Sequence, residues 1–543
     1  MSEPTNAETS AEGTPQEKSP WYTGVTRYQW LVLAIASAGW IFDVFEGQLF
    51  VIYKTPAMAE VLDVDGSTQA GKDAIDAWSI YALASFLVGG ALGGLVFGVL
   101  ADRIGRQKSM IWSIAVYSFF TALHFWVTDA WQIVALRFFV AMGVGGEWAI
   151  AASLVSEVFP KRARAAAGGI FHASSVLGAV FASLCGMLLA ESDWRFAFLI
   201  GLLPALLIVW IRASLKESEK WQESQSAVSD SGTAPASGSV RELLLTPRTR
   251  SRALIGLSLA SVGLGTYWGI YAWGNELAKQ VLIDDVASLS GAALDERVVE
   301  VLAPHIDESA VPDDLLPSQS ELTSVQKSIW KVTLRVTRAL DEESAQIPVL
   351  KENELKLLAA AQVSHNGATR EFVEPLLREL AAGSLGDSYR GAKASSAYLV
   401  MNFTGGLLGL LCFAPLASFT NRRKAFTVYH IGALIMAPVT FLLASSYFTC
   451  VMLLSVMAFF VVGMHAGYAI YFPELFPTRL RATGTSFCFN MARLVSAIVI
   501  VGRVPLKAEF GLRNAVSIMA LLFAAGLVTI WFAPETRDTD LED

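Results

Sequence analysis

The sequence predicts an all-α membrane protein with twelve transmembrane helices arranged in two six-helix halves. Three observations carry this prediction. The 543 residues are 53% hydrophobic and 17% charged, with a mean hydropathy of +0.46, which is too apolar for an ordinary soluble protein. Apolar runs long enough to span a bilayer as a helix, about 20 residues, recur along the chain. Short motifs in the first half reappear in the second.

Each apolar run is expected to form one transmembrane helix, with ends placed to within a few residues. The polar and charged stretches between the runs are the expected loops. The predicted helices cover residues 28–53, 78–101, 109–128, 131–157, 165–190, 195–214, 251–275, 395–417, 425–446, 449–471, 483–503 and 513–533.

The loops sort into two sets by charge. One set is basic and falls on one side of alternating spans, whereas the short loops near residue 129 and at 445–448 carry no Lys or Arg. Basic loops lie on the cytoplasmic side. We therefore expect a multi-pass protein of the plasma (inner) membrane with both termini in the cytoplasm. The basic segments are "DRIGRQK" (102–108), "PKRAR" (160–164), the linker near 216–252, "NRRK" (421–424) and "PTRLR" (477–481).

An internal repeat relates the halves. "EVFPKRAR" (157–164) follows the fourth span and "ELFPTRLR" (474–481) follows the tenth. A weaker match joins "LADRIGRQK" (100–108) to "LASFTNRRK" (416–424) at nearly the same offset. Two halves of the same orientation follow, related by an axis along the membrane normal.

The remaining segments are polar. The first residues lack the basic and apolar regions of a cleaved signal, so we expect a disordered tail. A Ser-, Glu- and Ala-rich segment predicts a flexible linker. The long insertion has helix-period apolar positions at 324–340 and 371–383, which predict a small helical extracytoplasmic domain of unidentified protein partner. The expected parts are a tail (1–27), the first half (28–215), the linker (216–250), helix seven (251–275), the insertion (276–394), helices eight to twelve (395–533) and a tail (534–543).

Several motifs resemble those of the major facilitator superfamily. "GVLADRIGRQK" (98–108) resembles its loop signature between helices two and three. The resemblance extends over the twelve spans, through "RFFVAMGVGGEW" (137–148), both Glu-x-Phe-Pro-x-Arg-x-Arg elements and "PETRD" (534–538). It implies the major facilitator fold and alternating-access transport of a small molecule across the lipid bilayer.

The loop signature predicts a cytoplasmic gate. A carboxylate at a helix end can accept bonds from nearby Arg side chains or from a helix N-terminus. Glycines allow close packing and a tight turn. Such a cluster can hold the two halves together in the outward-open state; control of topology by positive charge is the simpler alternative. The residues are Gly98, Asp102, Arg103, Gly105 and Arg106.

The second copy of the loop has Ser418 where the first has its aspartate, so the gate should be asymmetric. In the other repeat, Glu157 with Arg164 and Glu474 with Arg481 are expected to form gate ion pairs. A solvated helix end is the alternative for each pair.

Charged residues inside the spans predict a proton-coupling site. Asp43 lies roughly 10 Å below the outer hydrocarbon edge, and Arg137 about 9 Å below it, at 1.5 Å per residue. Arg137 is thus the expected partner of Asp43, Glu46 or both. Two acids that share one Arg leave one charge over, so one acid should exchange a proton near working pH. A purely structural ion pair is the alternative. Proton symporters of the resembled superfamily also pair a first-helix acid with a fourth-helix Arg.

Glu147 follows "GVGG" in the fourth span. Its "GGEW" context resembles that of metabolite, sialate and lactate proton symporters, which implies a proton relay or a place in the gate. A structural hydrogen-bonded role is equally open.

The predicted substrate site centres on Arg493, a cation near the middle of span eleven. We expect Arg493 to bind the carboxylate of an anionic substrate, although a salt bridge to another helix is the alternative. Polar and aromatic neighbours of the expected cavity are Asn490, Asn402, Trp268, Tyr271 and Trp273.

Other chemistry is not indicated. The histidines at 124, 172, 430 and 465 show no ligand spacing, and no phosphate-binding Gly-x-x-x-x-Gly-Lys or nucleophile–base motif is present. We expect no metal, cofactor, nucleic-acid partner or enzymatic activity. The favoured function is proton symport of an organic acid. A sugar:proton symporter is the alternative among transporters, because "AWGNEL" in span seven and the insertion depart from the resembled group. A transporter-like receptor without net flux is the alternative from another class, and it would use the insertion and the cytoplasmic linker.

Overall fold

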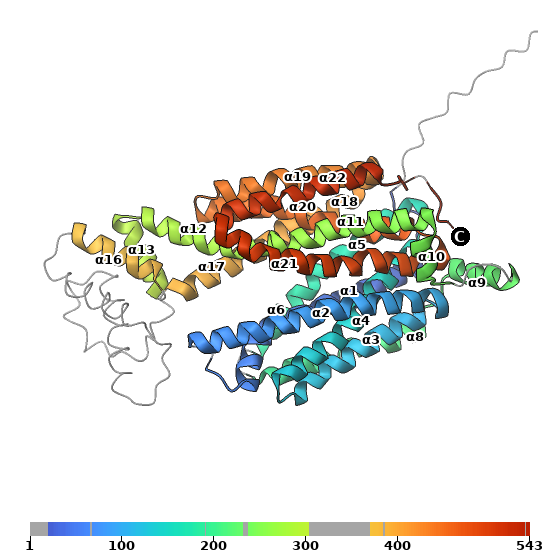
Figure 1. The fold of residues 1–543 in the computed structure, drawn as a ribbon, viewed down its shortest axis with the longest axis horizontal. Coiled ribbons are helices and arrows are strands. Elements are labelled where there is room, and N and C mark those ends of the chain that lie inside the picture. Colours follow the sequence, from blue (N-terminus) through green and yellow to red (C-terminus); the bar gives the residue numbers. More distant parts are fainter. Residues whose placement is uncertain are drawn as a thin grey trace, which may run out of the picture.

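The computed structural model consists of two helical bundles that lie side by side (Figure 1). Within the described residues every regular element is helical. The structure describes residues 20–65, 68–189, 192–231, 237–302, 370–383, 386–537 and 539–542.

The first bundle holds the six predicted spans of the first half. A capping box starts its first helix, because the Thr26 and Gln29 side chains bond each other's backbone N–H groups. Gly105 ends the second helix at φ +104°, a conformation that favours glycine. The helices are α1 (Arg27–Val61), α2 (Gln69–Ile104), α3 (Arg106–Ala122) with η1 (Leu123–Trp126), α4 (Ala130–Val158), α5 (Lys161–Ala173) with α6 (Ser175–Leu188), and α7 (Trp194–Ile200) with α8 (Ala205–Ser214).

The second bundle repeats this plan. Its last two spans join in one long helix that is interrupted at Gly511, where φ is +74°. The helices are α11 (Pro247–Gly269) with η2 (Tyr271–Trp273), α17 (Asp387–Val400) with the π-helical turn η6 (Met401–Gly406) and α18 (Leu407–Phe419), α19 (Arg422–Leu443), α20 (Tyr447–Glu474), η7 (Thr478–Leu480), α21 (Arg481–Met519) and α22 (Leu521–Phe532).

The structure accounts for all twelve predicted spans. Ten stretches of the described chain are apolar and long enough to cross a membrane. One of these, Thr478–Phe532, holds both spans eleven and twelve, and the 17-residue helix α3 supplies span three. The predicted all-α fold of two six-helix halves is confirmed.

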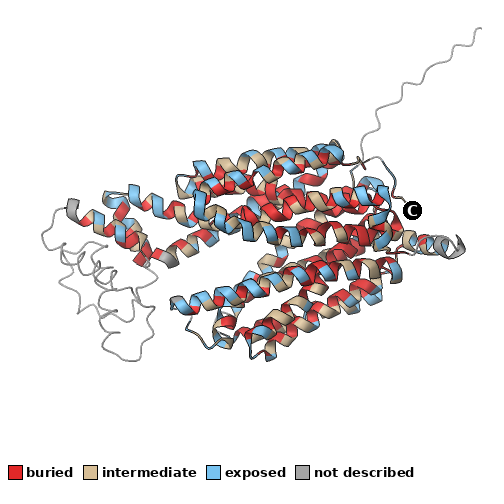
Figure 2. Ribbon diagram, viewed as in Figure 1, coloured by how far each residue is buried: buried red, intermediate tan, exposed pale blue. Residues whose placement is uncertain are grey.

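Small residues set the close approach of the helices. A Cβ on Gly93 would collide with the backbone of Met142, and one on Gly145 would collide with the backbone of Gly90. In a bilayer the hydrophobic effect does not hold helices together, because lipid is as apolar as the helix surface. Close packing of this kind stabilises the helix pair instead. Figure 2 shows buried residues concentrated along the inner helices and exposed ones on the periphery.

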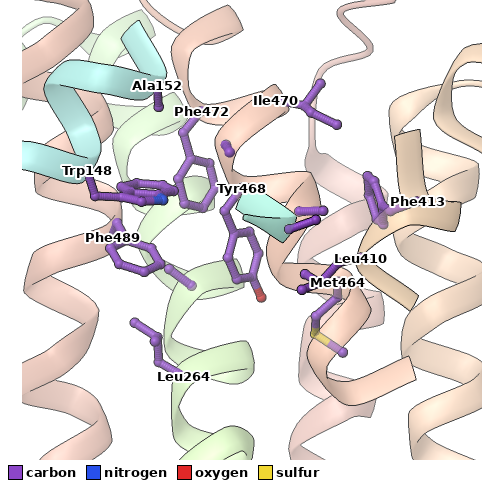
Figure 3. Packing of buried hydrophobic residues seen from close by; sticks show 14 of the residues in the cluster. Trp148, Ala152, Leu264, Leu410, Phe413, Met464, Tyr468, Ile470, Phe472 and Phe489 are labelled. Carbon is purple, nitrogen blue, oxygen red and sulfur yellow. The ribbon is translucent and has the colours of Figure 1, made fainter. Parts of the chain in front are cut away.

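Aromatic rings pack the two bundles together at the centre. Trp148 of α4 stacks on Phe489 of α21, with ring centroids 4.0 Å apart (Figure 3). Tyr468 of α20 lies beside them and donates its hydroxyl to the Leu259 carbonyl at 2.9 Å. The hydrophobic core therefore runs through both halves.

The prediction of a flexible linker at 216–250 is wrong in part. The segment contains two helices, α9 (Glu219–Ser231) and α10 (Val240–Leu245). Glu217 caps the start of α3 by accepting from Arg106 N at 2.6 Å and Gln107 N at 3.2 Å. Trp221 donates to the Asp102 carbonyl at 2.9 Å. These contacts order a segment whose composition alone predicts flexibility.

The insertion extends helices seven and eight away from the bundles (Figure 1). Its helices are α12 (Gly274–Ser288), α13 (Gly291–Leu302) and α16 (Arg370–Ala382), which share a small core of their own that includes Val298 and Leu377. The helix predicted at 371–383 coincides with α16. The one predicted at 324–340 lies outside the described residues.

Candidate functional site

Glu46 and Arg137 form a buried ion pair between α1 and α4. Glu46 is 1% exposed, and its Oε1 accepts from Arg137 Nη1 at 2.5 Å. Thr121 of α3 lies 3.4 Å from the same oxygen. The guanidinium lies 4.4 and 4.3 Å from the ring centroids of Phe50 and Phe86. This pair is charge-balanced and enclosed by aromatic rings.

Of the two acids that depth offered as partners of Arg137, Glu46 pairs with it and Asp43 does not. It is 2% exposed and interacts electrostatically with Glu147, Arg493 and Glu46. Side chains three residues apart on an α-helix differ in direction by about 60°, so Asp43 and Glu46 contact different neighbouring residues. The count of residues along each helix placed Asp43 and Arg137 at the same depth in the membrane. It could not give the direction in which each side chain points around its helix axis.

Glu147 faces Asp43 across the α1–α4 contact. It is fully buried, and a Cβ on Gly39 of α1 would collide with its carboxyl group. The Asp43 and Glu147 carboxyl groups lie within reach of each other. The buried hydroxyl of Tyr117 also faces Asp43. Two buried carboxyl groups therefore meet here with one cation in reach.

That cation is Arg493 of α21, which reaches from the second half into the first. A Cβ on Gly90 of α2 would collide with its Nη1, and its charge interacts with Asp43. Nη1 is buried and has no hydrogen-bond partner among the described residues. Asn490, one turn away, donates to the Gly145 carbonyl at 2.9 Å. Arg493 thus sits between the halves with unused donor capacity.

The predicted aromatic wall is partly assembled. Tyr271 stacks on Tyr267 with ring centroids 4.9 Å apart and lies 5.7 Å from the ring of Tyr398. Asn402 lies in the π-helical turn and donates to the Tyr398 carbonyl at 2.8 Å. Tyr267 and Tyr398 belong to this cluster although the sequence did not single them out.

Trp268 and Trp273 instead lie beside Arg503 of α21. Arg503 Nη1 donates to the Trp268 carbonyl at 2.5 Å, and its guanidinium lies 5.1 Å from the Trp273 ring centroid. The break between α11 and η2 turns Tyr271 away from its two Trp neighbours, which is why the three do not share one face.

Two histidines that sequence reasoning set aside meet at the interface. His172 of α5 and His465 of α20 lie 6.4 Å apart between ring centroids, with a 16° angle between the rings. They belong to different halves and are 293 positions apart (465 minus 172). No local spacing could reveal such a pair, and the repeat does not relate the two positions to each other.

Asp102 joins the halves at the basic end of the bundle, defined by loops 102–108, 160–164, 421–424 and 477–481. Its carboxylate accepts from Arg106 at 2.8 Å within its own half. Across the interface it accepts from Ala482 N at 3.1 Å, Thr483 N at 2.9 Å and Thr483 Oγ1 at 2.6 Å. Asp102 thereby caps the N-terminus of α21.

The other repeat forms ion pairs different from those expected. Glu157 accepts from Arg106 at 2.7 Å and from Arg481 at 3.0 Å, whereas Glu474 accepts from Arg422 at 2.8 Å. Arg164 interacts electrostatically with Glu474. The expected partners within each copy are therefore exchanged between the copies. The turn after each glutamate directs the following Arg toward the other half.

The remaining gate residues fill supporting positions. Arg103 donates to the Ser237 carbonyl at 3.3 Å rather than to Asp102, because it points outward from the end of α2. Gly98 packs against Ala482 and Ser486 of α21, where a Cβ would be too close. The C-terminal segment joins them, since the Glu542 carbonyl accepts from Thr478 N at 2.9 Å.

Polar contacts between the halves gather on one side. Those described reach from the basic end to the bond between Asn490 and Gly145, and include a second bond from Ser486 to the Gly94 carbonyl. Farther from the basic end than the Asn490–Gly145 bond, no hydrogen bond or ion pair joins the described parts of residues 27–214 to those of residues 247–533. The structure is therefore closed at the basic end.

Two repeated six-helix bundles, buried charges at their interface and closure at one end define a membrane transporter. The sequence comparisons agree. The models described as Major Facilitator Superfamily and as Sugar (and other) transporter match residues 22–291 and 384–543. The chain belongs to the major facilitator superfamily. It is a multi-pass integral membrane protein of the inner membrane and not an enzyme.

Known proteins resemble the chain over different extents. A putative metabolite transport protein of Haemophilus influenzae is 24% identical over 95% of this chain and 99% of that protein. The sialic acid transporter NanX of Escherichia coli is 32% identical over 37% of this chain and 48% of its own. A structure of the proton:xylose symporter XylE, bound to 6-bromo-6-deoxy-D-glucose, covers 94% of this chain and 96% of its own, with TM-score 0.56 at 14% identity. This last likeness shows the fold.

Proposed function

We propose that the protein is a secondary active transporter that carries an organic acid together with protons by alternating access. The observation that carries the proposal is the group formed by Asp43, Glu147 and Arg493. It places two acids and one cation at the interface of two halves that must rock against each other. With the basic end in the cytoplasm, as the positive-inside rule requires, the structure is closed to the cytoplasm.

Charge balance gives the proposed coupling. Two buried carboxylates beside one guanidinium would leave a net negative charge, which is costly away from water. With Glu147 protonated, Asp43 and Arg493 compensate each other. A substrate carboxylate that binds Arg493 displaces Asp43, which then takes up a proton. The group stays neutral in both states, and each monocarboxylate enters with one proton.

The Glu46–Arg137 pair has a separate role in this proposal. Its charges already balance, and the ring stacking over Arg137 holds α1 against α4. We assign it to positioning Asp43 opposite Glu147 and assign proton exchange to the latter two residues. The Asp102 network then breaks whenever the cytoplasmic end opens.

Uptake into liposomes tests the proposal. Purified protein with an imposed proton gradient should accumulate a subset of a panel of organic acids, and thermal-shift binding identifies that subset. Asp43→Asn should abolish proton-driven accumulation but retain exchange of the acid across the membrane. Equal loss of both activities in a correctly folded variant would favour a structural role for Asp43.

A sugar symporter is the second candidate, favoured by the match of residues 384–543 to the Sugar (and other) transporter model. Sugars in the same liposome panel separate the two functions. Binding of a solute without flux under any gradient would instead support a receptor.

A further inference from the structure

A groove runs between α11 and α22 on the surface of the second half. The two helices lie side by side, because Ser258 Oγ and Thr529 Oγ1 share a hydrogen bond of 2.8 Å. The groove has a volume of about 440 Å³, and Pro247, the first residue of α11, is part of its lining. Both helices reach the end of the bundle that carries the C-terminus (Figure 1). The groove therefore lies at the basic end, away from the interface between the halves.

Most of the groove is apolar and faces the lipid. Leu254 is 52% exposed, Val528 62% and Phe532 71%, and all three line the groove. Side chains of this kind on a membrane-spanning helix are matched in polarity by the acyl chains around them. A molecule that fills this part of the groove must therefore be apolar and reach it from the bilayer.

Arg250 places a cation at the polar end of the groove. Arg248 and Arg252, on the same two turns of α11, both donate to Glu542 Oε1, at 2.5 and 2.9 Å. Side chains two residues apart on an α-helix differ in direction by about 200°, so Arg250 points away from this pair and lines the groove. Its side chain is exposed and has no hydrogen-bond or ion-pair partner among the described residues.

We propose that the groove binds one anionic phospholipid of the cytoplasmic leaflet. The phosphate goes to Arg250, because a guanidinium matches phosphate oxygens with two parallel N–H groups. One acyl chain lies along Leu254, Val528 and Phe532. The leaflet follows from the basic end being cytoplasmic, as in the proposed function, and the binding does not depend on which solute is carried.

The polar and apolar parts follow in the order that a phospholipid requires. Leu254 and Ile255 come one turn of α11 after Arg250 and Ser251, about 6 Å along the axis at 1.5 Å per residue. The Ser251 hydroxyl can donate to a second phosphate oxygen. The N-terminus of a helix also favours an anion, and Thr246 provides no side-chain cap there. The charged headgroup therefore meets the cationic end while the acyl chain enters the apolar part.

A second groove shows why the free guanidinium matters. It lies between spans eleven and twelve, farther from the basic end, and is also lined mainly by apolar residues together with one arginine, Arg503. Arg503 is already engaged, because its Nη1 donates to the Trp268 carbonyl at 2.5 Å and its guanidinium lies 5.1 Å from the Trp273 ring centroid. This groove should therefore accept acyl chains without a preference for headgroup charge.

Photo-cross-linking of the full-length protein in nanodiscs tests the proposal. Phosphatidylglycerol or phosphatidylcholine, each with the same diazirine-labelled acyl chain, is added to a phosphatidylcholine bilayer, and mass spectrometry identifies the labelled peptides. Residues 247–255 and 528–532 should be labelled about 5- to 10-fold more by phosphatidylglycerol, since one arginine at the membrane surface favours an anionic lipid by about that factor. Residues 499–506 and 518–522, around the second groove, should be labelled equally by both lipids.

Variants assign the preference to the groove. Arg250→Gln should bring the ratio of labelling at residues 247–255 close to one. The matched control is Arg248→Gln, which removes the same charge from the same helix turn but lies outside the lining of the groove, and it should keep the ratio. Val528→Trp leaves Arg250 in place and fills the apolar part, so it should reduce labelling by both lipids there.

Four results would overturn the proposal. The first two are an equal labelling ratio at both grooves in the native protein and an unchanged ratio in Arg250→Gln. The third is a dimer that Val528→Trp dissociates, which would place a second copy of the chain in the groove. The fourth is loss of the phosphatidylglycerol preference when inorganic phosphate is added in excess, which would make Arg250 a simple anion site. Uptake of organic acids into liposomes is a separate measurement, so the proposed function stands or fails independently.

Discussion

Removing one charge at Asp102 should open the basic end. Asp102→Asn keeps the size of the side chain but replaces one carboxylate oxygen, which accepts hydrogen bonds, by an N–H₂ group, which can only donate. The donors that faced that oxygen then lose their acceptor. Three bonds to Ala482 and Thr483 cross between the halves. Arg106 keeps its bond to Glu157, so no arginine is left unpaired. Losing one or two charge-assisted bonds, at about 1.5–3 kcal/mol each, gives a cost of about 3 kcal/mol to the closed state.

That cost corresponds to a roughly 100-fold shift toward states open at the basic end, at 1.4 kcal/mol per tenfold. Spin labels at Lys108 and Lys424, both exposed and equivalent in the repeat, report the distance between the halves by double electron–electron resonance in nanodiscs. The four native cysteines would first be replaced. The variant should add a longer distance component.

The matched control is Asp540→Asn. Asp540 also bridges the halves, 3.4 Å from Lys161, but its side chain is 91% exposed. Exposed pairs contribute 0–1 kcal/mol at most, so its distance distribution should equal that of the native protein. If Asp102→Asn also left the distribution unchanged, the assignment of Asp102 to closure would be refuted.

The remaining predictions concern binding, packing and pH. Arg493→Gln should weaken binding of acids by at least tenfold and spare folding; unchanged affinity would contradict its role. Gly145→Ala should lower the stability by about 1–3 kcal/mol through overpacking, whereas Gly47→Ala, with open space around it, should not destabilise; thermal unfolding compares them. Hydrogen bonding from Arg195 lowers the pKa of Glu60 below 4.5. The native protein should therefore be more stable than Glu60→Gln above pH 4.5, and this difference should disappear as pH falls through the lowered pKa of Glu60. Equal melting curves of the two proteins at neutral pH would contradict the prediction.

Sequence reasoning gave the helices and their order because hydrophobic length and loop charge are local properties. The partners of buried charges were not local. Depth along a helix follows from residue count, but the direction of Asp43 depends on the rotation of α1, which only the packing of Gly39 against Glu147 of α4 determines. His172 and His465 were missed for the same reason. Composition likewise could not show that Glu217 and Trp221 dock the linker on α2 and α3.

The exchanged partners of the repeat carry a consequence for how such a protein can be assembled. Glu157 of one copy meets Arg481 of the other, and Arg164 faces Glu474 in return. Reciprocal contacts of this kind are what a symmetric dimer of identical units forms. The single chain therefore contains an interface of the kind found between two subunits. Two separately synthesised halves would carry complementary charges that favour their association.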